Sequence, residues 1–286
     1  MPTPVHVIAA TGRSGAALCA ELRQAGIPIV PVVRNPAKWT DPAVPARKAD
    51  LTDPTALRAA LADATRVVSC AHARHIRAIL AAAPATARFV FLGSTRKFTQ
   101  WPDAHGNGVL AGEAAFQASG RDGVLLHPTM IYGASGENNV RRLAALVRRL
   151  PVLPLPNGGL SLVQPIHQDD VTRCILAALD HVWIGPHSLV IAGPSAVAYA
   201  DFVRAVARAD GRTARILRCP AGPLIALAGL TRALPFLPRI EPAEIRRLLE
   251  DKAFDITPMR QTLGVEPIPL EEGLARTFAA PHHPGR

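Results

Sequence analysis

The chain has 286 residues, of which 49% are hydrophobic, and its 32 Lys and Arg against 22 Asp and Glu give a net charge of +10. This length and hydrophobicity predict one large core, or a core with a smaller second lobe, and exclude a disordered chain. The positive charge is spread along the chain as Arg, and aromatic residues make up only 5%. We therefore expect no nucleic-acid partner, and we expect anionic small molecules or a membrane surface to match the charge.

Segments for membrane crossing, secretion or metal binding are not expected. No run reaches about 18 uninterrupted apolar residues, and the N-terminus shows no basic region followed by an apolar signal core, so we expect a cytoplasmic protein. Cys19 and Cys70 lie within apolar patterns and are expected to be buried, reduced thiols. His72 and His75 are three residues apart, but no nearby Cys or acidic residue completes a metal site, so none is expected.

The first strong pattern is an apolar run from Val5 that meets a small-residue turn and then an Ala-rich helical stretch ending near Gly26. A strand, a glycine turn and a helix in this order predict a dinucleotide phosphate site, because the helix N-terminus offers free N–H groups to an anion. Ala9 occupies the place of the first glycine of the usual motif, so an ordinary turn is the alternative. The turn residues expected to contact a cofactor are Thr11, Gly12, Arg13, Ser14 and Gly15.

The second predicted strand, residues 27–33, ends at Arg34. An acidic residue here would bind the ribose of NAD, whereas the planar donors of an Arg suit the 2′-phosphate of NADP. Arg13 is within reach of the same phosphate. We therefore expect NADP(H), with NAD(H) the less favoured cofactor, and the alternative is that Arg34 is a solvated surface residue.

The next segments continue an alternation of strands and helices. Strands are predicted at 67–71, 88–95 and 123–128, with helices at 55–62, capped by Asp53, at 76–82 and at 109–119, and a polar loop at 96–108. This alternation predicts an α/β fold with a doubly wound parallel sheet of the Rossmann type. The residues placed beside the cofactor at strand ends and loops are Asp50, Leu51, Ala71 and Pro128.

The second half predicts a smaller, mainly α-helical lobe that covers the substrate. Residues 1–128 form the expected nucleotide-binding core and 129–286 the lobe, with roughly 160–193 returning to the sheet. The Pro-rich residues 151–159 lead into a short extended stretch at 160–166, and residues 223–238 read as a pocket wall, a lid, plain lobe packing or a peripheral membrane contact. The expected helices are 140–150, capped within 137–139, then 171–181, capped by Asp169 or Asp170, and then 199–209, 242–252, 258–263 and 270–279.

Taken together, these motifs resemble the short-chain dehydrogenase/reductase superfamily, in its extended and atypical branches near the nucleoside-diphosphate-sugar epimerases. The stretches that carry the resemblance are residues 10–15, 50–53, 91–95, 127–133, 164–171 and 263–274. The resemblance implies a Rossmann fold, a pyridine-nucleotide cofactor and a catalytic Ser or Thr, Tyr and Lys, the last two in a Tyr-x-x-x-Lys motif.

This chain departs from the catalytic pattern of that superfamily. Neither Tyr132 nor Tyr199 is followed by a Lys four residues later, and the expected Tyr and Lys positions fall near Gly106 and Leu110. Only the Ser/Thr member remains, as Ser94 with Thr95 beside it. Lys97 and His105 follow in the predicted loop and are either substitutes for the proton-transfer groups or solvated residues.

Two functions are compatible with these observations. The first is an NADP(H)-binding oxidoreductase or epimerase-like enzyme that acts on a carbonyl, quinone or sugar-type small molecule with a non-standard site, bordered by His127, Pro128 and Tyr132. The second is a non-catalytic NADP(H)-binding redox sensor or assembly subunit. A monomer or a homodimer is expected.

Overall fold

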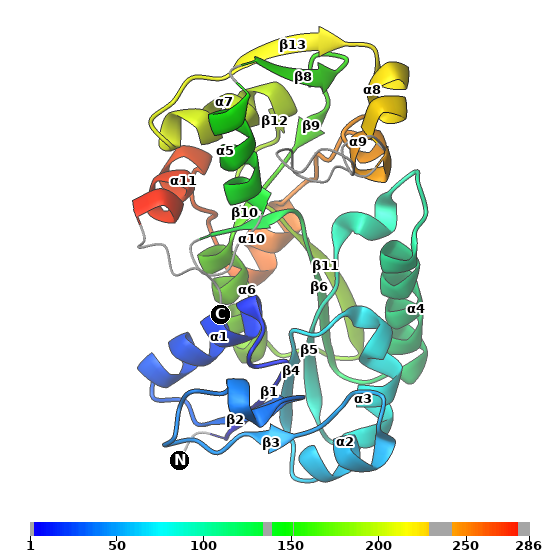
Figure 1. The fold of residues 1–286 in the computed structure, drawn as a ribbon. Coiled ribbons are helices and arrows are strands. Elements are labelled where there is room, and N and C mark those ends of the chain that lie inside the picture. Colours follow the sequence, from blue (N-terminus) through cyan, green and yellow to red (C-terminus); the bar gives the residue numbers. More distant parts are fainter. Residues whose placement is uncertain (1–2, 134–138, 151, 229–241, 280–286) are drawn as a thin grey trace.

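A seven-stranded parallel sheet forms the centre of the computed structural model, which describes residues 3–133, 139–150, 152–228 and 242–279 (Figure 1). Its strands are β1 (Val5–Ile8), β2 (Ile29–Val33), β3 (Arg47–Lys48), β4 (Arg66–Ser69), β5 (Arg88–Leu92), β6 (Gly123–Pro128) and β11 (Pro186–Ile191). Their order across the sheet is β11-β6-β5-β4-β1-β2-β3. The predicted α/β, doubly wound fold class is confirmed.

Helices cover both faces of the sheet. One face carries α1 (Arg13–Gln24), α6 (Gln168–Asp180) and α10 (Thr257–Leu263), and the other carries α2 (Pro54–Ala60), α3 (Ile76–Ala82) and α4 (Ala104–Ser119). Successive strand residues point to opposite faces, so that Val7 packs in the core under α1 and Ile8 in the core under α2. Because both faces are buried, the strands are apolar throughout, as parallel strands are.

The strand order reverses between β1 and β4. From β1 the chain winds outward through β2 to β3, and from β4 it winds the other way through β5 and β6. Loops that follow the carboxyl ends of strands diverge at such a point and leave a crevice, which is where ligands bind in open α/β sheets. The glycine turn after β1 and Ala71 after β4 therefore flank one crevice.

Helix α4 begins five residues earlier than the predicted start at Val109. Asp103 caps it by accepting a hydrogen bond from the Gly106 N–H at 2.8 Å. The glycines of the predicted loop are instead contact points of the helix, because a Cβ on Gly106 would lie 2.9 Å from the Arg96 carbonyl oxygen and a Cβ on Gly108 2.8 Å from Cε1 of His72. The prediction of a loop through residue 108 was wrong, and His105 belongs to the first turn of the helix.

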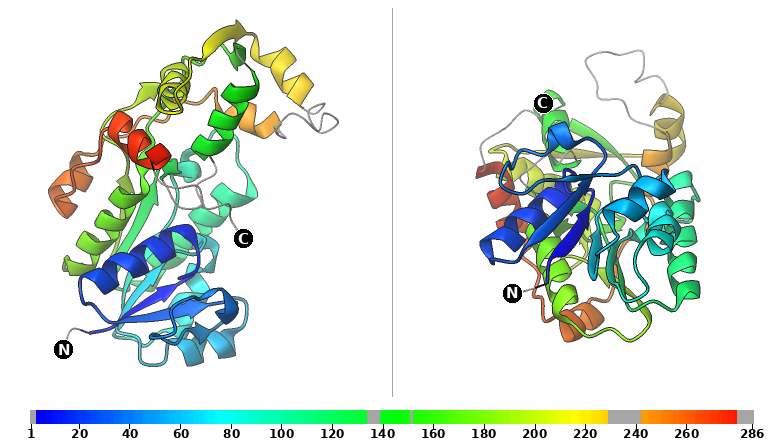
Figure 2. Two further views of the ribbon diagram at one scale, coloured as in Figure 1. Left: turned by 60° about the vertical axis from the view of Figure 1, so that its left-hand side comes forward. Right: turned by 90° about the horizontal axis from the view of Figure 1, so that it is seen from below.

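The second lobe lies above the carboxyl edge of the sheet (Figures 1 and 2). Its helices are α5 (Asn139–Arg149), α7 (Tyr199–Ala209), α8 (Ala221–Ala228), α9 (Pro242–Arg247) and α11 (Leu270–Ala279). Its strands are β7 (Ile131–Tyr132), β8 (Val152–Pro156), β9 (Leu162–Val163), β10 (Ile166–His167), β12 (Val197–Ala198) and β13 (Arg215–Cys219). The Pro-rich segment contains β8, which pairs with β13 in a two-stranded ribbon whose open edge tolerates proline.

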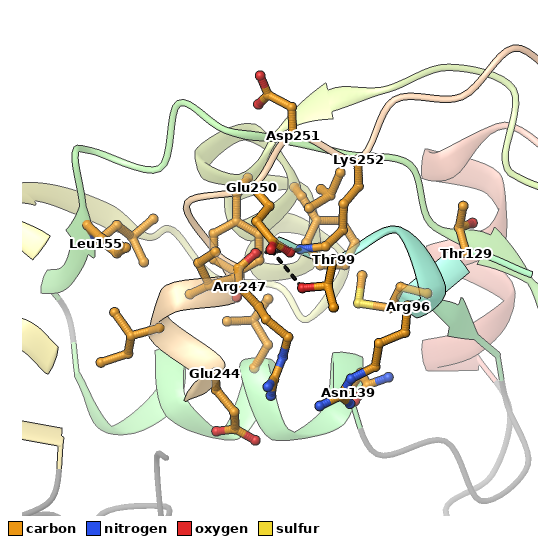
Figure 3. Close-up of a pocket in the computed structure, with 18 of the residues that line it drawn as sticks. Arg96, Thr99, Thr129, Asn139, Leu155, Glu244, Arg247, Glu250, Asp251 and Lys252 are labelled. Carbon is orange, nitrogen blue, oxygen red and sulfur yellow. Dashed lines mark hydrogen bonds and ion pairs between the residues drawn. The ribbon is translucent and has the colours of Figure 1, made fainter. Parts of the chain in front are cut away.

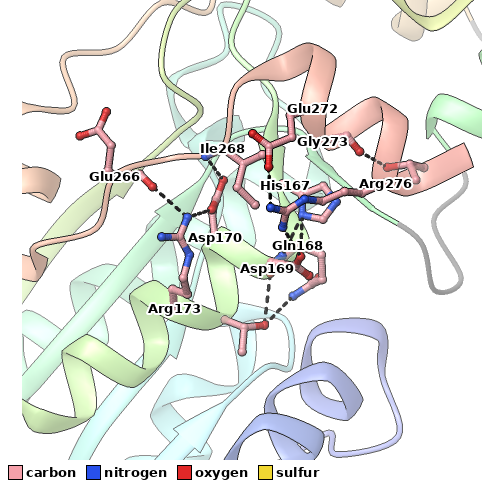
Figure 4. A network of polar contacts seen from close by, with 12 residues as sticks. His167, Gln168, Asp169, Asp170, Arg173, Glu266, Ile268, Glu272, Gly273 and Arg276 are labelled. Carbon is pink, nitrogen blue, oxygen red and sulfur yellow. Dashed lines mark hydrogen bonds and ion pairs between the residues drawn. The ribbon is translucent and has the colours of Figure 1, made fainter. Parts of the chain in front are cut away.

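Between the lobe strands and the sheet, the chain returns through β10, α6 and β11. The side chain of His167 caps α6 by accepting from the Asp169 N–H at 3.2 Å, so the prediction of an Asp169 or Asp170 cap was wrong. Asp170 is fully buried instead and holds Arg173 and the Ile268 N–H, the latter at 2.9 Å (Figure 4). This network joins α6 to the chain that enters α11.

Some expectations fall on residues outside the described ranges. These are Glu137 and Asn138 of the predicted α5 cap, most of the apolar segment 223–238 and the C-terminal tail. Within the ranges that the structure does describe, no helix is long and apolar enough to cross a membrane.

Candidate functional site

The glycine turn after β1 is built for close contact between helix and strand. Gly12 donates its N–H to the Ala9 carbonyl oxygen at 2.9 Å and starts α1 without a side-chain cap. A Cβ on Gly12 would lie 3.1 Å from that oxygen, and a Cβ on Gly15 only 2.2 Å from it. Ala9 itself has φ +61°, a left-handed conformation that favours glycine. The turn thus keeps the geometry of a glycine motif even where its first glycine is replaced.

The entrance of α1 fits a bound pyrophosphate. Thr11, Gly12 and Arg13 are exposed, and the first turn of the helix contains no acidic residue. The uncapped N–H groups and the positive end of the helix dipole therefore face solvent. The Ser14 hydroxyl donates to the Gln168 side-chain oxygen at 3.0 Å, which ties the turn to α6.

Arg34 is exposed immediately after β2, next to the loop that begins at Asp50. The Asp50 carboxylate accepts hydrogen bonds from the hydroxyl and backbone N–H of Thr52, at 2.7 and 2.9 Å, and these lower its pKa, with a further contribution from the Arg34 charge. The guanidinium of Arg34 thus lies in the electrostatic neighbourhood of a loop expected beside the adenosine.

The other residues expected at the cofactor follow the carboxyl ends of the strands. Leu51 is half-buried against the core between the sheet and α2, and Ala71 is half-buried two residues after β4. Pro128 ends β6, and its carbonyl oxygen accepts a hydrogen bond from the Thr95 hydroxyl at 3.3 Å. The fold brings the turn, Ala71 and the β5 end to the same edge of the sheet.

A cavity of about 770 Å³ lies between that edge and the second lobe (Figure 3). Ser94 and Thr95, which follow β5, line it together with His105 of α4. The Ser94 oxygen accepts the Arg96 N–H at 3.1 Å, so its own hydroxyl proton is left to donate elsewhere. This volume is typical of a small-molecule site.

Lys97, one of the two substitutes suggested by the sequence, points away from this cavity into a partly buried polar cluster. Its ammonium lies 2.6 Å from both Glu113 carboxylate oxygens and 3.1 Å from Nε2 of the fully buried His127. The Ser188 hydroxyl donates to Glu113 at 2.6 Å. Burial raises the pKa of Glu113, but the hydrogen bonds from Lys97 and Ser188 outweigh it and leave the pKa below its usual value.

His105, the other substitute, lines the cavity and contacts a second histidine. Its ring centroid lies 4.3 Å from that of His72 in an edge-to-face arrangement. Nδ1 of His72 accepts the Arg74 N–H at 3.1 Å, and within the described part of the chain its buried Nε2 has no partner. Burial lowers the pKa of His72 to about 4 and also lowers that of His105. Both imidazoles are therefore neutral near pH 7.

Two residues expected to border the site lie elsewhere. Tyr132 is 1% exposed in the lobe core, where its hydroxyl would stand 2.1 Å from a Cβ on Gly273. Burial raises the pKa of this phenol, which makes it a poor acid. His127 lies beneath Gly93, inside the polar cluster, and does not line the cavity. Both expectations were wrong, because the side chains of these segments turn inward.

The sequence did not predict that residues between 244 and 254 form one wall of the cavity. Glu250 is 8% exposed and accepts hydrogen bonds from the Thr99 hydroxyl and the Gln100 N–H, both at 2.7 Å (Figure 3). Arg247 approaches Asp103, the α4 cap, at 3.8 Å. These contacts span about 150 residues of sequence, and no local pattern marks them. The only sign of this wall in the sequence was that a charged segment, residues 242–252, follows the apolar segment 223–238.

All four cysteines are free thiols, and burial raises the pKa values of Cys19, Cys70 and Cys174 to about 12. Such thiols are not nucleophiles at neutral pH. Among the described residues, no group of three or more His, Cys, Asp or Glu could hold a metal ion.

Solved structures with a similar fold include two that contain a pyridine nucleotide and one that contains UDP-glucose. MoeE5 in complex with UDP-glucuronic acid and NAD aligns with a TM-score of 0.73 at 19% identity, over 97% of this chain and 98% of that one. The NADPH-dependent quinone oxidoreductase QOR2 of Escherichia coli, complexed with NADPH, aligns with a TM-score of 0.74 at 18% identity, over 96% and 99%. A UDP-glucose 4-epimerase of Thermotoga maritima with UDP-glucose gives 0.73 at 14%, over 97% and 98%.

Sequence comparison gives relatives and a family. The uncharacterized protein Rv2047c of Mycobacterium tuberculosis is 28% identical over 276 residues, which cover 92% of this chain, and the chain spans only 28% of that relative. A family model described as NAD(P)H-binding matches residues 9–181. The predicted resemblance to the short-chain dehydrogenase/reductase superfamily is confirmed, and the chain belongs to the NAD(P)H-binding family.

Proposed function

We propose that the chain is an NADP(H)-dependent oxidoreductase that acts on a carbonyl-type group of a small molecule held under the second lobe. The observation that carries this proposal is the shared cavity, in which Ser94 and Thr95 at the end of β5 and His105 at the start of α4 line one space. The glycine turn and Ala71 follow β1 and β4 at the same carboxyl edge of the sheet, and they do not themselves line this cavity. The bound nicotinamide would supply or accept the hydride.

The residues that would hold the cofactor are those of the glycine turn and the strand ends. Gly12 and Gly15 allow the backbone to approach the pyrophosphate, and the α1 N-terminus supplies N–H donors. Arg34 and Arg13 would pair with a 2′-phosphate, which is the basis for preferring NADP(H). Asp50 and Leu51 would lie beside the adenosine, and Ala71 and Pro128 nearer to the nicotinamide.

Ser94 and His105 would have different roles at the substrate. Ser94 keeps a hydroxyl proton to donate to the substrate oxygen, because its own oxygen already accepts the Arg96 N–H. Thr95 is tied to Pro128 and fixes the backbone around Ser94. His105 would carry the proton that the superfamily's Tyr carries, with its ring held against His72. Lys97 has no such role, since Glu113 holds it outside the cavity.

The direct test is NADPH oxidation with a panel of aldehydes, ketones, quinones and sugars. We expect turnover with at least one class and a loss of kcat of about 100-fold or more in Ser94→Ala and His105→Ala. The matched control is Ser119→Ala, at the far end of α4. Tight NADPH binding without turnover on any class would overturn the proposal and favour a non-catalytic sensor or assembly subunit.

A further inference from the structure

The wall of the cavity is largely apolar away from Ser94. Leu143 and Leu146 project from one face of α5, Leu150 follows the helix, and Leu153 and Leu155 come from β8. Leu143, Leu153 and Leu155 are buried in the core of the lobe, and Leu146 and Leu150 are half-buried beside it, so this core reaches the cavity. An apolar molecule that covers the half-buried part of this wall removes it from water, which is favourable.

An aromatic ring four residues after Ser94 in the chain lines the same cavity. Phe98 lies in the short helix η3 (Thr95–Phe98), lines the cavity and is 54% exposed. Its ring centroid lies 5.7 Å from that of Phe254, which also lines the cavity. Large exposed aromatic side chains in a concave site are typical of ligand recognition, and a planar ring would stack against them.

The charged groups of the wall are paired with one another. Arg96 donates to the Asp103 carboxylate at 2.7 Å through Nε, and Lys252 lies 3.9 Å from Glu250. Arg142 approaches Glu244 at 3.6 Å. With Arg247 beside Asp103, each of these four wall cations has a carboxylate partner. These four cations share three carboxylates, Asp103, Glu244 and Glu250, so a nucleoside diphosphate would bring two negative charges to a wall whose positive charge is already mostly paired.

Together these observations separate two classes of substrate. We propose that the cavity takes an uncharged quinone or aromatic carbonyl compound with an apolar chain, and not a nucleoside-diphosphate sugar. The reacting ring lies at Phe98 and Ser94, and the chain extends along the leucines of α5 and β8. This assignment rests on the proposed function, because it presumes that the oxygen-bearing end meets Ser94.

The test measures binding separately from turnover. Equilibrium dialysis of the protein loaded with NADP⁺, which cannot deliver a hydride, compares a benzoquinone bearing a decyl chain with menadione and with UDP-glucose. We expect the decyl quinone to bind at least about tenfold more tightly than UDP-glucose. Tighter binding of UDP-glucose than of either quinone would overturn the assignment.

Two substitutions at Leu146 locate the bound chain. Leu146→Glu places a charge in the apolar wall, and we expect it to weaken decyl-quinone binding about tenfold or more. Leu146→Trp keeps the wall apolar but fills the cavity, so it weakens the decyl quinone more than menadione. The control is Leu217→Glu on β13, where the leucine is 53% exposed and outside the cavity. Unchanged decyl-quinone binding in both Leu146 variants would contradict the assignment.

The substrate class and the proposed function fail in different ways. If quinone binding follows these expectations but NADPH is never oxidised in its presence, the cavity assignment stands and the oxidoreductase proposal falls. If NADPH reduces sugars or small aldehydes while the quinones fail to bind, the oxidoreductase proposal stands and the cavity assignment falls.

Discussion

A methyl group on Gly15 would stand 2.2 Å from the carbonyl oxygen of Ala9, closer than any real contact allows. The first turn of α1 therefore rests directly on the end of β1, and the conformation of the glycine turn depends on this approach. A Gly-to-Ala substitution inside a helix normally stabilises a protein by about 0.5–1 kcal/mol. A loss of stability on substitution of Gly15 would therefore indicate the close contact with Ala9.

Gly15→Ala should destabilise the protein by about 2 kcal/mol or more and abolish measurable NADPH binding, because backbone must shift to admit the Cβ. Urea unfolding and NADPH titration measure the two effects. The matched control is Gly222→Ala in α8, where a Cβ meets nothing within 4 Å. Equal stability of the two variants would refute the close approach.

Ala9→Gly should act in the opposite direction. Ala9 has φ +61°, and a left-handed conformation costs a non-glycine residue about 1–2 kcal/mol. Part of this gain is lost to the greater chain entropy of glycine, so we expect a net stabilisation of about 0.5–1 kcal/mol in urea unfolding. A destabilised variant would show that the Ala9 methyl group contributes packing that outweighs its backbone strain.

Arg34→Ala should weaken NADPH binding by about 10- to 100-fold and leave NADH binding nearly unchanged, since a charge-assisted hydrogen bond contributes about 1.5–3 kcal/mol. Fluorescence titration with both cofactors measures this. Arg215→Ala, an exposed arginine in β13 of the lobe, is the control for net charge. Parallel losses for NADPH and NADH would mean that Arg34 does not contact the 2′-phosphate.

The sheet and the glycine turn after β1 could be predicted because their signals are local. Apolar runs, the Gly12–Gly15 spacing and the Asp53 cap each lie within a few residues of what they specify. The start of α4 was missed for a physical reason: glycine both breaks helices and permits close packing. Only the position of His72, more than thirty residues away, shows that Gly108 does the second.

The rest of the candidate site depends on contacts between distant segments. Nothing near His105 indicates that His72 packs against it, and nothing near Lys97 indicates that it meets Glu113 and His127 under the sheet. The sequence left Lys97 and His105 as equal substitutes, and only their burial and partners separate them. The Glu250 wall is likewise set by tertiary folding.

Lys97→Met should destabilise the protein by about 3 kcal/mol, because the half-buried Glu113 would lose its cation. Adding Glu113→Gln should restore most of this stability, since the amide keeps a hydrogen bond with Ser188 and carries no charge. Urea unfolding of the single and double variants measures the recovery. Turnover in the double variant should stay within about threefold of wild type. A stable but inactive double variant would instead make Lys97 part of the chemistry.

His105 should set the pH dependence of turnover. Burial, together with the nearby Arg96 charge, lowers the pKa of His105 below its ordinary 6.5. In the reducing direction the imidazolium gives up the proton, so kcat should fall as pH rises through that lowered pKa, by about tenfold per unit. In the oxidising direction the neutral ring accepts the proton, so kcat should be flat above pH 7 and fall at lower pH.

His105→Gln should lower kcat and should remove the change of kcat with pH from both profiles, because glutamine forms hydrogen bonds but does not titrate. His187→Gln, at the outer edge of the sheet on β11, should leave both profiles as in wild type. The measurement is kcat between pH 5 and 9 in each direction. If the His105→Gln profile kept the wild-type limb at a reduced rate, another group would carry the proton and His105 would only position the substrate.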